Sequence, residues 1–216
     1  MAKVNAWIQG HLLLLKILLF AGLITPAVGM VLAAFGKGWV DLGADPVEKL
    51  LHECGEIGLQ LLLITLAVTP ARKLLKLPAL VRFRRMLGLF SFTYLILHFT
   101  VYAWLDQKLS LARILEDIVE RPYITIGFAA LVMLVPLAVT STNAMMRRLK
   151  RKWATLHKLI YPISILGVWH FWWQVKQDIR EPLIYAGILA LLLGFRVVDW
   201  QIRKRRAAAR RPPAAS

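Results

Sequence analysis

The sequence predicts an all-α membrane protein, a six-helix transmembrane bundle, and two observations support this prediction. Hydrophobic residues make up 58% of the 216 residues, and the mean hydropathy of +0.59 exceeds what a soluble domain normally carries. Apolar windows of about 20 residues, the length of helix that crosses a bilayer core, also recur along the chain. Six such windows fill most of it, at 11–35, 47–69, 86–105, 123–143, 154–173 and 182–198.

The first window, 11–35, is expected to be a retained helix. It is too long for the apolar part of a signal peptide, Lys16 interrupts it, and no small-residue cleavage site stands out before the next window. We therefore treat residues 1–200 as a single transmembrane domain. No internal repeat is evident in the sequence.

Charge gives these windows an orientation. The segments 72–85, 147–152 and 203–211 contain bases and no acid, whereas the alternate segments 37–49, 106–121 and 176–181 mix both signs. Bases accumulate on the cytoplasmic side of membrane proteins, so we expect both termini to be cytoplasmic. The net charge of +16 then reflects topology and attraction to membrane lipid, and gives no reason to expect nucleic acid as a partner.

The connections leave little room for a second domain. The longest, near 106–121, can hold only a short surface helix, and the tail 201–216 is basic, ends in prolines and alanines, and is expected to be disordered in the cytoplasm. Cys54 is the only cysteine, which excludes an internal disulfide, a cysteine-ligated iron–sulfur cluster and a CxxCH haem attachment. Any cofactor must be held by other side chains.

Histidines are the candidate ligands. A rise of 1.5 Å per residue places His157 about 8 Å, His98 about 20 Å, His170 about 27 Å and His52 about 30 Å from the basic edge of their helices. A single intramembrane histidine often only bonds a neighbouring helix, but several on adjacent helices favour metal ligation. His11 is treated as ordinary.

Haem suits these histidines better than zinc does. A zinc site gathers three or four ligands at one point, whereas these histidines are spread over separate helices. A porphyrin supplies four nitrogens itself, so that the protein adds only axial ligands and a flat apolar slot. Aromatic residues flank His98 and His170, although Trp104, Trp172 and Trp173 fit an interfacial belt better. Gly55 and Gly58 after His52 would let a ring or helix approach closely.

The fifth window carries two histidines whose phase is uncertain from the sequence. His157 and His170 are 13 residues apart, about 20 Å in rise and roughly 220° in rotation on an ideal helix. Pro162 between them interrupts such a helix. Two stacked sites therefore remain open, as does a pairing of His52 with His170.

Four segments together resemble the MsrQ (YedZ) family, haem-binding membrane subunits of the periplasmic methionine-sulfoxide reductase system of bacteria, within the ferric-reductase-like transmembrane superfamily. The resemblance covers roughly residues 40 to 198 and is carried by "LGADPVEKLLHECG", "RFRRMLGLFSFTYLILHFTVYAWL", "RPYITIGFAALVMLVPLAVTSTNAMMRRLKRKWATLHKLIYPISILGVWHFWW" and "EPLIYAGILALLLGFR".

The resemblance implies a b-type haem, with a flavin also reported for the family. It implies a location in the bacterial inner membrane, and electron transfer from the quinone pool or a cytoplasmic flavin reductase to a periplasmic molybdenum-containing partner, MsrP, which reduces methionine sulfoxide. It assigns His98, His157 and His170 as haem ligands and matches His52 to a further histidine of less certain role. This chain would itself carry no substrate-reducing site.

The cytoplasmic side of the bundle then has a single candidate haem ligand, His157, where a haem with two histidine ligands needs two. A flavin such as FMN on this side would explain why the second ligand is missing. Arg82, Arg84, Arg85 and the run 140–143 offer charge and hydrogen bonds for a phosphate and a ribityl chain, although the same arginines also fit the positive-inside rule. The alternative function is a proton or small-solute transporter that relays protons through the histidines, Glu53 and Glu56. Against it, we find no pair of short, broken helices in repeated positions.

Overall fold

The predicted all-helical fold is confirmed. The computed structural model describes residues 1–37, 39–175 and 178–209, and these residues form helices and no β-strand. Five helical stretches are long and apolar enough to cross a membrane. They are α2 (Leu12–Ala34), α3 (Pro46–Leu74), α4 (Arg84–Val101) continued by the π-helical turn η2 (Tyr102–Asp106), α6 (Pro122–Val139) and α10 (Arg180–Ala209).

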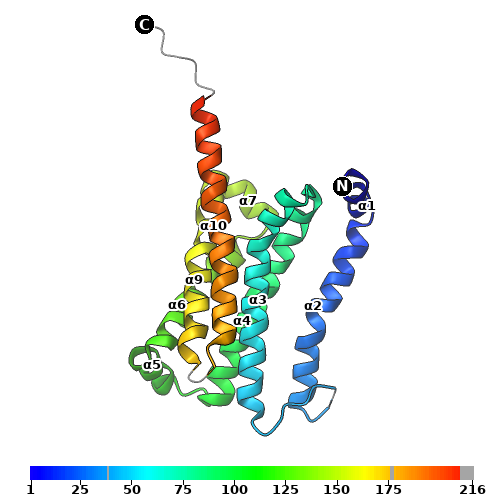
Figure 1. Ribbon diagram of the computed structural model, residues 1–216. Coiled ribbons are helices and arrows are strands. Elements are labelled where there is room, and N and C mark those ends of the chain that lie inside the picture. The colour runs from blue at the N-terminus through cyan, green and yellow to red at the C-terminus, as the bar shows by residue number, and fades with distance from the viewer. Residues whose placement is uncertain (38, 176–177, 210–216) are drawn as a thin grey trace.

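The remaining elements are short. They are α1 (Ala2–Gly10), η1 (Pro78–Phe83), α5 (Leu111–Glu120), α7 (Asn143–Leu149), α8 (Arg151–Leu156), η3 (His157–Leu159) and α9 (Ile160–Gln174). Helix α5 lies in the connection 106–121, where a short surface helix was expected. Figure 1 shows it beside α6, at the end of the bundle away from α1.

The window 154–173 differs from a single uninterrupted helix. Here α8, η3 and α9 follow one another, and α9 alone has 15 residues. Pro162 lies in the first turn of α9 and has no N–H to donate, so the carbonyl one turn earlier, that of Lys158, lacks its usual partner and the chain tightens into the 3-10 segment η3. The count of six spans stays a prediction.

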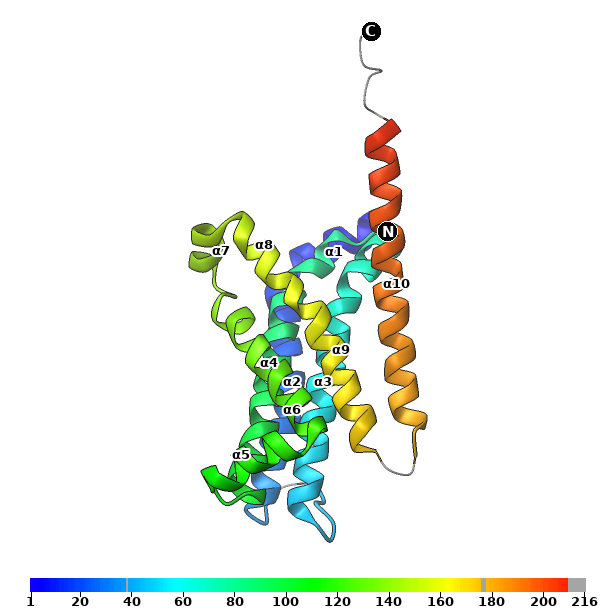
Figure 2. The same ribbon diagram turned by 90° about the vertical axis from the view of Figure 1, so that its left-hand side faces the viewer.

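Helix α3 is the centre of the bundle. Its residues Leu59, Leu62 and Leu66 pack into one apolar cluster with α6, α9 and α10, while Leu61 and Val68 pack into a second cluster with α2 and α4. Figure 2 shows α10 running along one edge of the molecule, where it contacts α3 and α9. Because α3 serves both clusters, side chains on α3 can face sites on two sides of the bundle.

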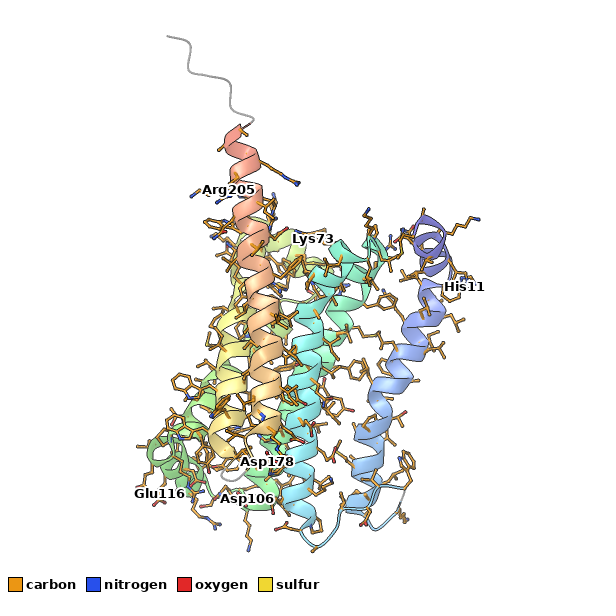
Figure 3. All side chains as sticks on the ribbon, viewed as in Figure 1. His11, Lys73, Asp106, Glu116, Asp178 and Arg205 are labelled. Carbon is orange, nitrogen blue, oxygen red and sulfur yellow. The ribbon has the colours of Figure 1, made fainter. Side chains whose placement is uncertain are left out.

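The two ends of the bundle differ in charge. Figure 3 places Lys73, Arg205 and His11 toward one end and Asp106, Glu116 and Asp178 toward the other. Helix α1 and the C-terminal end of α10 both lie at the basic end (Figure 1). The alternation of basic and mixed connections is therefore an alternation of ends. That the basic end faces the cytoplasm remains a prediction.

The tail departs from the expected boundary at residue 200. Helix α10 continues to Ala209, and residues 210–216 lie outside the described part of the chain. Two features favour the extension. Alanine and arginine are strong helix formers, and the Asp199 carboxylate bonds both Lys73 on α3 and Arg203 one turn further along α10. Residues 201–209 are thus helical in the structure, and disorder of the tail stays a prediction.

Helix α2 is tied to the bundle through a buried tyrosine of α4. The Tyr94 hydroxyl donates to the Leu23 carbonyl (2.7 Å) and accepts from the Ala27 N–H (3.1 Å). An unbroken helix would pair these two α2 groups with each other. Pro26 lies inside α2 at this point, and a proline disturbs the helical hydrogen-bond ladder, so Tyr94 supplies a partner to both groups.

We predict that Tyr94→Phe lowers the free energy of unfolding by about 1 kcal/mol, the scale of an interhelical hydrogen bond inside a membrane. Unfolding of the purified protein in mixed micelles measures this. The control is Thr93→Val, because Thr93 is exposed and its hydroxyl bonds only the Leu89 carbonyl of its own helix. Equal unfolding of Tyr94→Phe and the wild type would contradict the role of this hydroxyl.

Candidate functional site

A cavity of about 270 Å³ lies between α3, α4, α6 and α9, toward the mixed-charge end of the bundle. Its walls carry two of the predicted ligands, His98 and His170, with His52 at the same cavity. Apolar side chains complete it, among them Leu59, Leu95, Phe99, Phe128 and Phe171. The cavity therefore combines a largely apolar lining with polar and charged side chains, among them Glu56, Asp106 and Arg121.

His98 projects from α4 toward α3. Its Nδ1 lies 2.9 Å from the carbonyl oxygen of Leu51. A carbonyl oxygen can only accept, so in the neutral ring Nδ1 carries the proton and Nε2 keeps its lone pair. A hydrogen bond of this kind fixes both the tautomer and the orientation of a ligand imidazole.

His170 repeats this arrangement on the other pair of helices. It projects from α9 toward α6, and its Nδ1 lies 2.7 Å from the carbonyl oxygen of Tyr123. Tyr123 also stacks on the His170 ring at a centroid distance of 6.2 Å. His170 is thus held in the same tautomer as His98, with Nε2 available to a ligand.

The two rings meet inside the cavity. Their centroids are 6.2 Å apart and their planes are 79° to each other. A metal–imidazole bond of about 2.0–2.1 Å, with about 1.1 Å more from nitrogen to ring centre, puts two imidazoles on opposite sides of one metal with centroids about 6.2 Å apart. In the described chain no three His, Cys, Asp or Glu side chains gather to bind an ion. The donor set therefore fits axial ligation of a haem iron, whose other ligands come from the porphyrin.

His52 is not part of this pair. Its side chain is exposed, at the mouth of the cavity, with Nε2 3.5 Å from the Gln174 Nε2 and 3.9 Å from the Glu48 carboxylate. Of the two pairings left open by the sequence, the structure brings together His98 with His170, and leaves His52 outside.

A polar network of three residues lies beside this cavity. The Glu56 carboxylate accepts hydrogen bonds from the Gln60 side chain (2.9 Å) and from the Tyr185 hydroxyl (3.0 Å). Tyr185 packs edge-on against Phe171, the residue after His170. Glu56 was noticed in the sequence as an intramembrane acid, but Gln60 and Tyr185 were missed, because nothing in the sequence indicates that α10 lies against α3.

A second cavity, of about 1180 Å³, lies toward the basic end of the bundle. His157 lines it, with Nδ1 3.1 Å from the Trp153 carbonyl oxygen and the ring stacked on Trp153 at 3.9 Å. Its Nε2 is buried, and it is the one such side-chain atom without a partner among the described residues. His157 therefore sits in a separate layer from His98 and His170.

Arg82, Arg84 and Arg85 all line this second cavity. Arg85 bonds the Asn143 side chain (2.7 Å) and the Ser141 carbonyl oxygen (3.3 Å). The run 140–143 is largely committed to the protein itself: the hydroxyls of Thr140 and Ser141 donate to carbonyls of α6, and Thr142 caps α7. The run thus positions Arg85 and offers a ligand less hydrogen bonding than the sequence led us to expect.

Arg196 is a further cation at this cavity that the sequence analysis missed. From α10 its guanidinium donates to the Leu66 carbonyl oxygen (2.8 Å) and the Tyr161 hydroxyl (3.2 Å). The signal that could have found it is its place near the end of the last apolar window, where a charge is expensive without partners.

The chain is similar to known proteins. The family model described as "Ferric reductase like transmembrane component" matches residues 54–168. A protein of Xanthomonas campestris pv. campestris (strain B100) is 58% identical over 178 residues, 81% of each chain. One of Bordetella pertussis (strain Tohama I) is 50% identical over 171 residues, 78% of this chain and 82% of its own. Both relatives are named protein-methionine-sulfoxide reductase heme-binding subunit MsrQ.

No solved structure gives a significant match to the chain. The family assignment therefore rests on sequence, and it agrees with the resemblance found in the four segments quoted above. The matched region 54–168 holds His98, His157 and the glycine-containing turn after His52. At 58% identity over four fifths of its length, the chain belongs to the MsrQ family of ferric-reductase-like transmembrane proteins.

Proposed function

We propose that this chain is the haem-binding, electron-transferring membrane subunit of a methionine-sulfoxide reductase system, with one b-type haem held between His98 and His170. The observation that carries the proposal is the facing pair of imidazoles, each with Nδ1 bonded to a carbonyl of a neighbouring helix. Bound there, the haem supplies reversible one-electron transfer through its iron. The chain itself binds the group, orients both ligands and surrounds them with apolar side chains.

The position of the His98–His170 pair suits delivery of electrons to a soluble partner. The cavity lies toward the mixed-charge end, near Asp106 and Arg121, which by the positive-inside rule is the periplasmic end. Cys54 is 3% exposed and its thiol faces the Met30 sulfur, so it is not available to reduce a sulfoxide. We infer that a periplasmic molybdenum-containing reductase of the MsrP type performs the reduction, as the resemblance implies.

The second cavity suits entry of electrons. Its arginines place positive charge next to His157 at the basic end. We propose that it holds the FMN expected from the sequence, with Arg84 and Arg85 near the phosphate, and that the quinone pool or a cytoplasmic flavin reductase supplies the electrons. If a second haem is bound at this end in addition, His157 would be one of its ligands. His52 would not be the other, because it lies at the first cavity.

The transporter alternative is less well supported. Glu53 pairs with Lys49 at the surface of α3, and Glu56 is bonded within its own network. Among the described residues neither acid bonds a histidine directly, whereas a proton relay requires a continuous chain of partners. A visible spectrum separates the two functions, because the proposed cytochrome has an intense Soret band that shifts on reduction and a transporter has none.

We predict that His98→Ala and His170→Ala each lose most of the bound haem while the protein still inserts, because insertion depends on hydrophobicity and flanking charge. The ratio of Soret to protein absorbance in purified protein measures the loss. His11→Ala is the control and His52→Ala is expected to keep its haem, because neither side chain belongs to the facing pair. Full haem retention in both the His98 and the His170 variant would contradict the assignment of these residues as ligands.

We predict that Arg84→Gln and Arg85→Gln lose bound flavin and keep the haem, because each removes a cation from the inner cavity and leaves the outer one intact. Flavin fluorescence of denatured samples gives the flavin content. Arg147→Gln removes one cation from the same end at an exposed position of α7 and serves as the control. Unchanged flavin in both variants would return these arginines to a purely topological role.

We predict that reduced haem is reoxidised through the mixed-charge end. Membranes containing the protein are reduced with dithionite, the reductant is removed, and an MsrP-type reductase and methionine sulfoxide are added. Haem reoxidation should require both additions. If the haem stays reduced with both present and is reoxidised promptly by an acceptor on the cytoplasmic side, the proposed direction is wrong.

A further inference from the structure

Each of the two facing histidines lies directly against a glycine of the neighbouring helix. A Cβ atom added to Gly127 would lie 2.7 Å from the Nδ1 of His170, 2.9 Å from its Cε1 and 3.0 Å from its Cγ. A Cβ atom added to Gly55 would lie 3.0 Å from the Nδ1 of His98 and 3.2 Å from its Cε1. Real Cβ contacts below 3.0 Å essentially do not occur, so the His170 ring has to move if Gly127 gains a side chain.

The glycine and the accepting carbonyl belong to the same turn of helix in both cases. Leu51 and Gly55 are four residues apart on α3, and so are Tyr123 and Gly127 on α6. The carbonyl that accepts from the histidine thus points along the helix toward the glycine. Only a residue without a side chain leaves room for the ring beside that carbonyl.

This arrangement occurs twice with one numerical offset. Adding 72 to the numbers of Leu51, Gly55 and His98 gives those of Tyr123, Gly127 and His170, and each histidine follows its carbonyl by 47 residues. The helix pairs α3–α4 and α6–α9 therefore present their imidazoles by the same construction. A glycine that recurs at the same place in both pairs, against the same ring atoms, is tied to the imidazole itself rather than to a local accident of packing.

We propose that Gly55 and Gly127 are positioning residues for the haem ligands: each lets an imidazole lie against the neighbouring helix, where the backbone carbonyl holds Nδ1 and directs Nε2 into the cavity. The proposal rests on the proposed function, because it concerns the ligands of that haem. On this proposal, two residues without side chains set the angle between the imidazole planes, which is 79° in this structure.

Close packing of helices is the competing explanation, and Gly58 separates the two. A Cβ atom on Gly58 would lie 2.7 Å from Cδ2 and 2.8 Å from Cγ of Leu95, and the three atoms nearest to it all belong to Leu95. Gly58 lies on α3, three residues after Gly55, and its clash is with an apolar side chain of α4. Gly58→Ala therefore tests whether a clash in the same α3–α4 contact, without direct contact on the His98 ring, is enough to alter haem binding.

The test compares Gly127→Ala and Gly55→Ala with two controls, Gly58→Ala and Gly167→Ala. Gly167 lies on α9 beside the same cavity, and its Cβ would make an ordinary contact of 3.4 Å with Leu59. The readouts are haem per protein and the low-spin ferric EPR signal, which depends on the angle between the imidazole planes. Membrane insertion is measured on the same samples by the amount of full-length protein.

We expect Gly127→Ala to lower haem affinity about 10–100-fold, the range for loss of groups that orient metal ligands. Gly55→Ala should have a smaller effect, because its closest contact is longer, and its remaining haem should show a shifted EPR signal. Gly167→Ala should keep the wild-type signal, and Gly58→Ala should change it less than Gly55→Ala does. If Gly127→Ala fails to insert, the milder Gly55→Ala alone decides.

Two kinds of failure are distinguishable. If His98→Ala and His170→Ala retain their haem, the proposed ligands are wrong and the positioning role is wrong with them. If those variants lose haem while Gly55→Ala and Gly127→Ala keep the wild-type haem content and EPR signal, the glycine inference alone is overturned. The same is true if Gly58→Ala changes the signal as much as Gly55→Ala does, since general packing would then explain the effect.

Discussion

The lack of water in a bilayer core is the constraint on which this structure depends, because every buried polar side chain must then find its partner inside the protein. Here backbone carbonyls of neighbouring helices meet that need. Ser91 donates to the Gly58 carbonyl, and Tyr94 donates to that of Leu23. His98 and His170 do the same at Leu51 and Tyr123. The interhelical bonds that hold the bundle together are therefore also the ones that orient the candidate ligands.

The sequence predicted the parts of this arrangement that depend on composition and helical rise. Apolar windows located the long helices, and the depth of His98 and His170 placed both toward the mixed-charge end. It could not predict that they pair, because depth says nothing about which way a ring faces. Nor could it identify Leu51 and Tyr123, which act through backbone atoms common to all residues. The phase of His157 depended on the 3-10 segment η3, which α-helical counting misses.

The repeated construction was also hidden in the sequence, for a physical reason. Leu51 and Tyr123 share no side-chain chemistry, yet each contributes the same carbonyl, and only the glycines and histidines coincide. Such a repeat is a property of helix-pair geometry and needs few identical residues. The inner layer has no such duplication, because His157 bonds a carbonyl of its own helical segment and its second nitrogen has no protein partner.

The segregation of charge between the two ends has an energetic consequence. With the basic end in the cytoplasm, an electron that passes from the inner cavity to the outer imidazole pair moves toward the positive side of the membrane voltage. A full crossing releases about 2.3 kcal/mol per electron for each 100 mV. The proposed route would therefore be electrogenic: cell energisation would favour outward transfer, and each electron delivered would partly discharge the membrane that drives it.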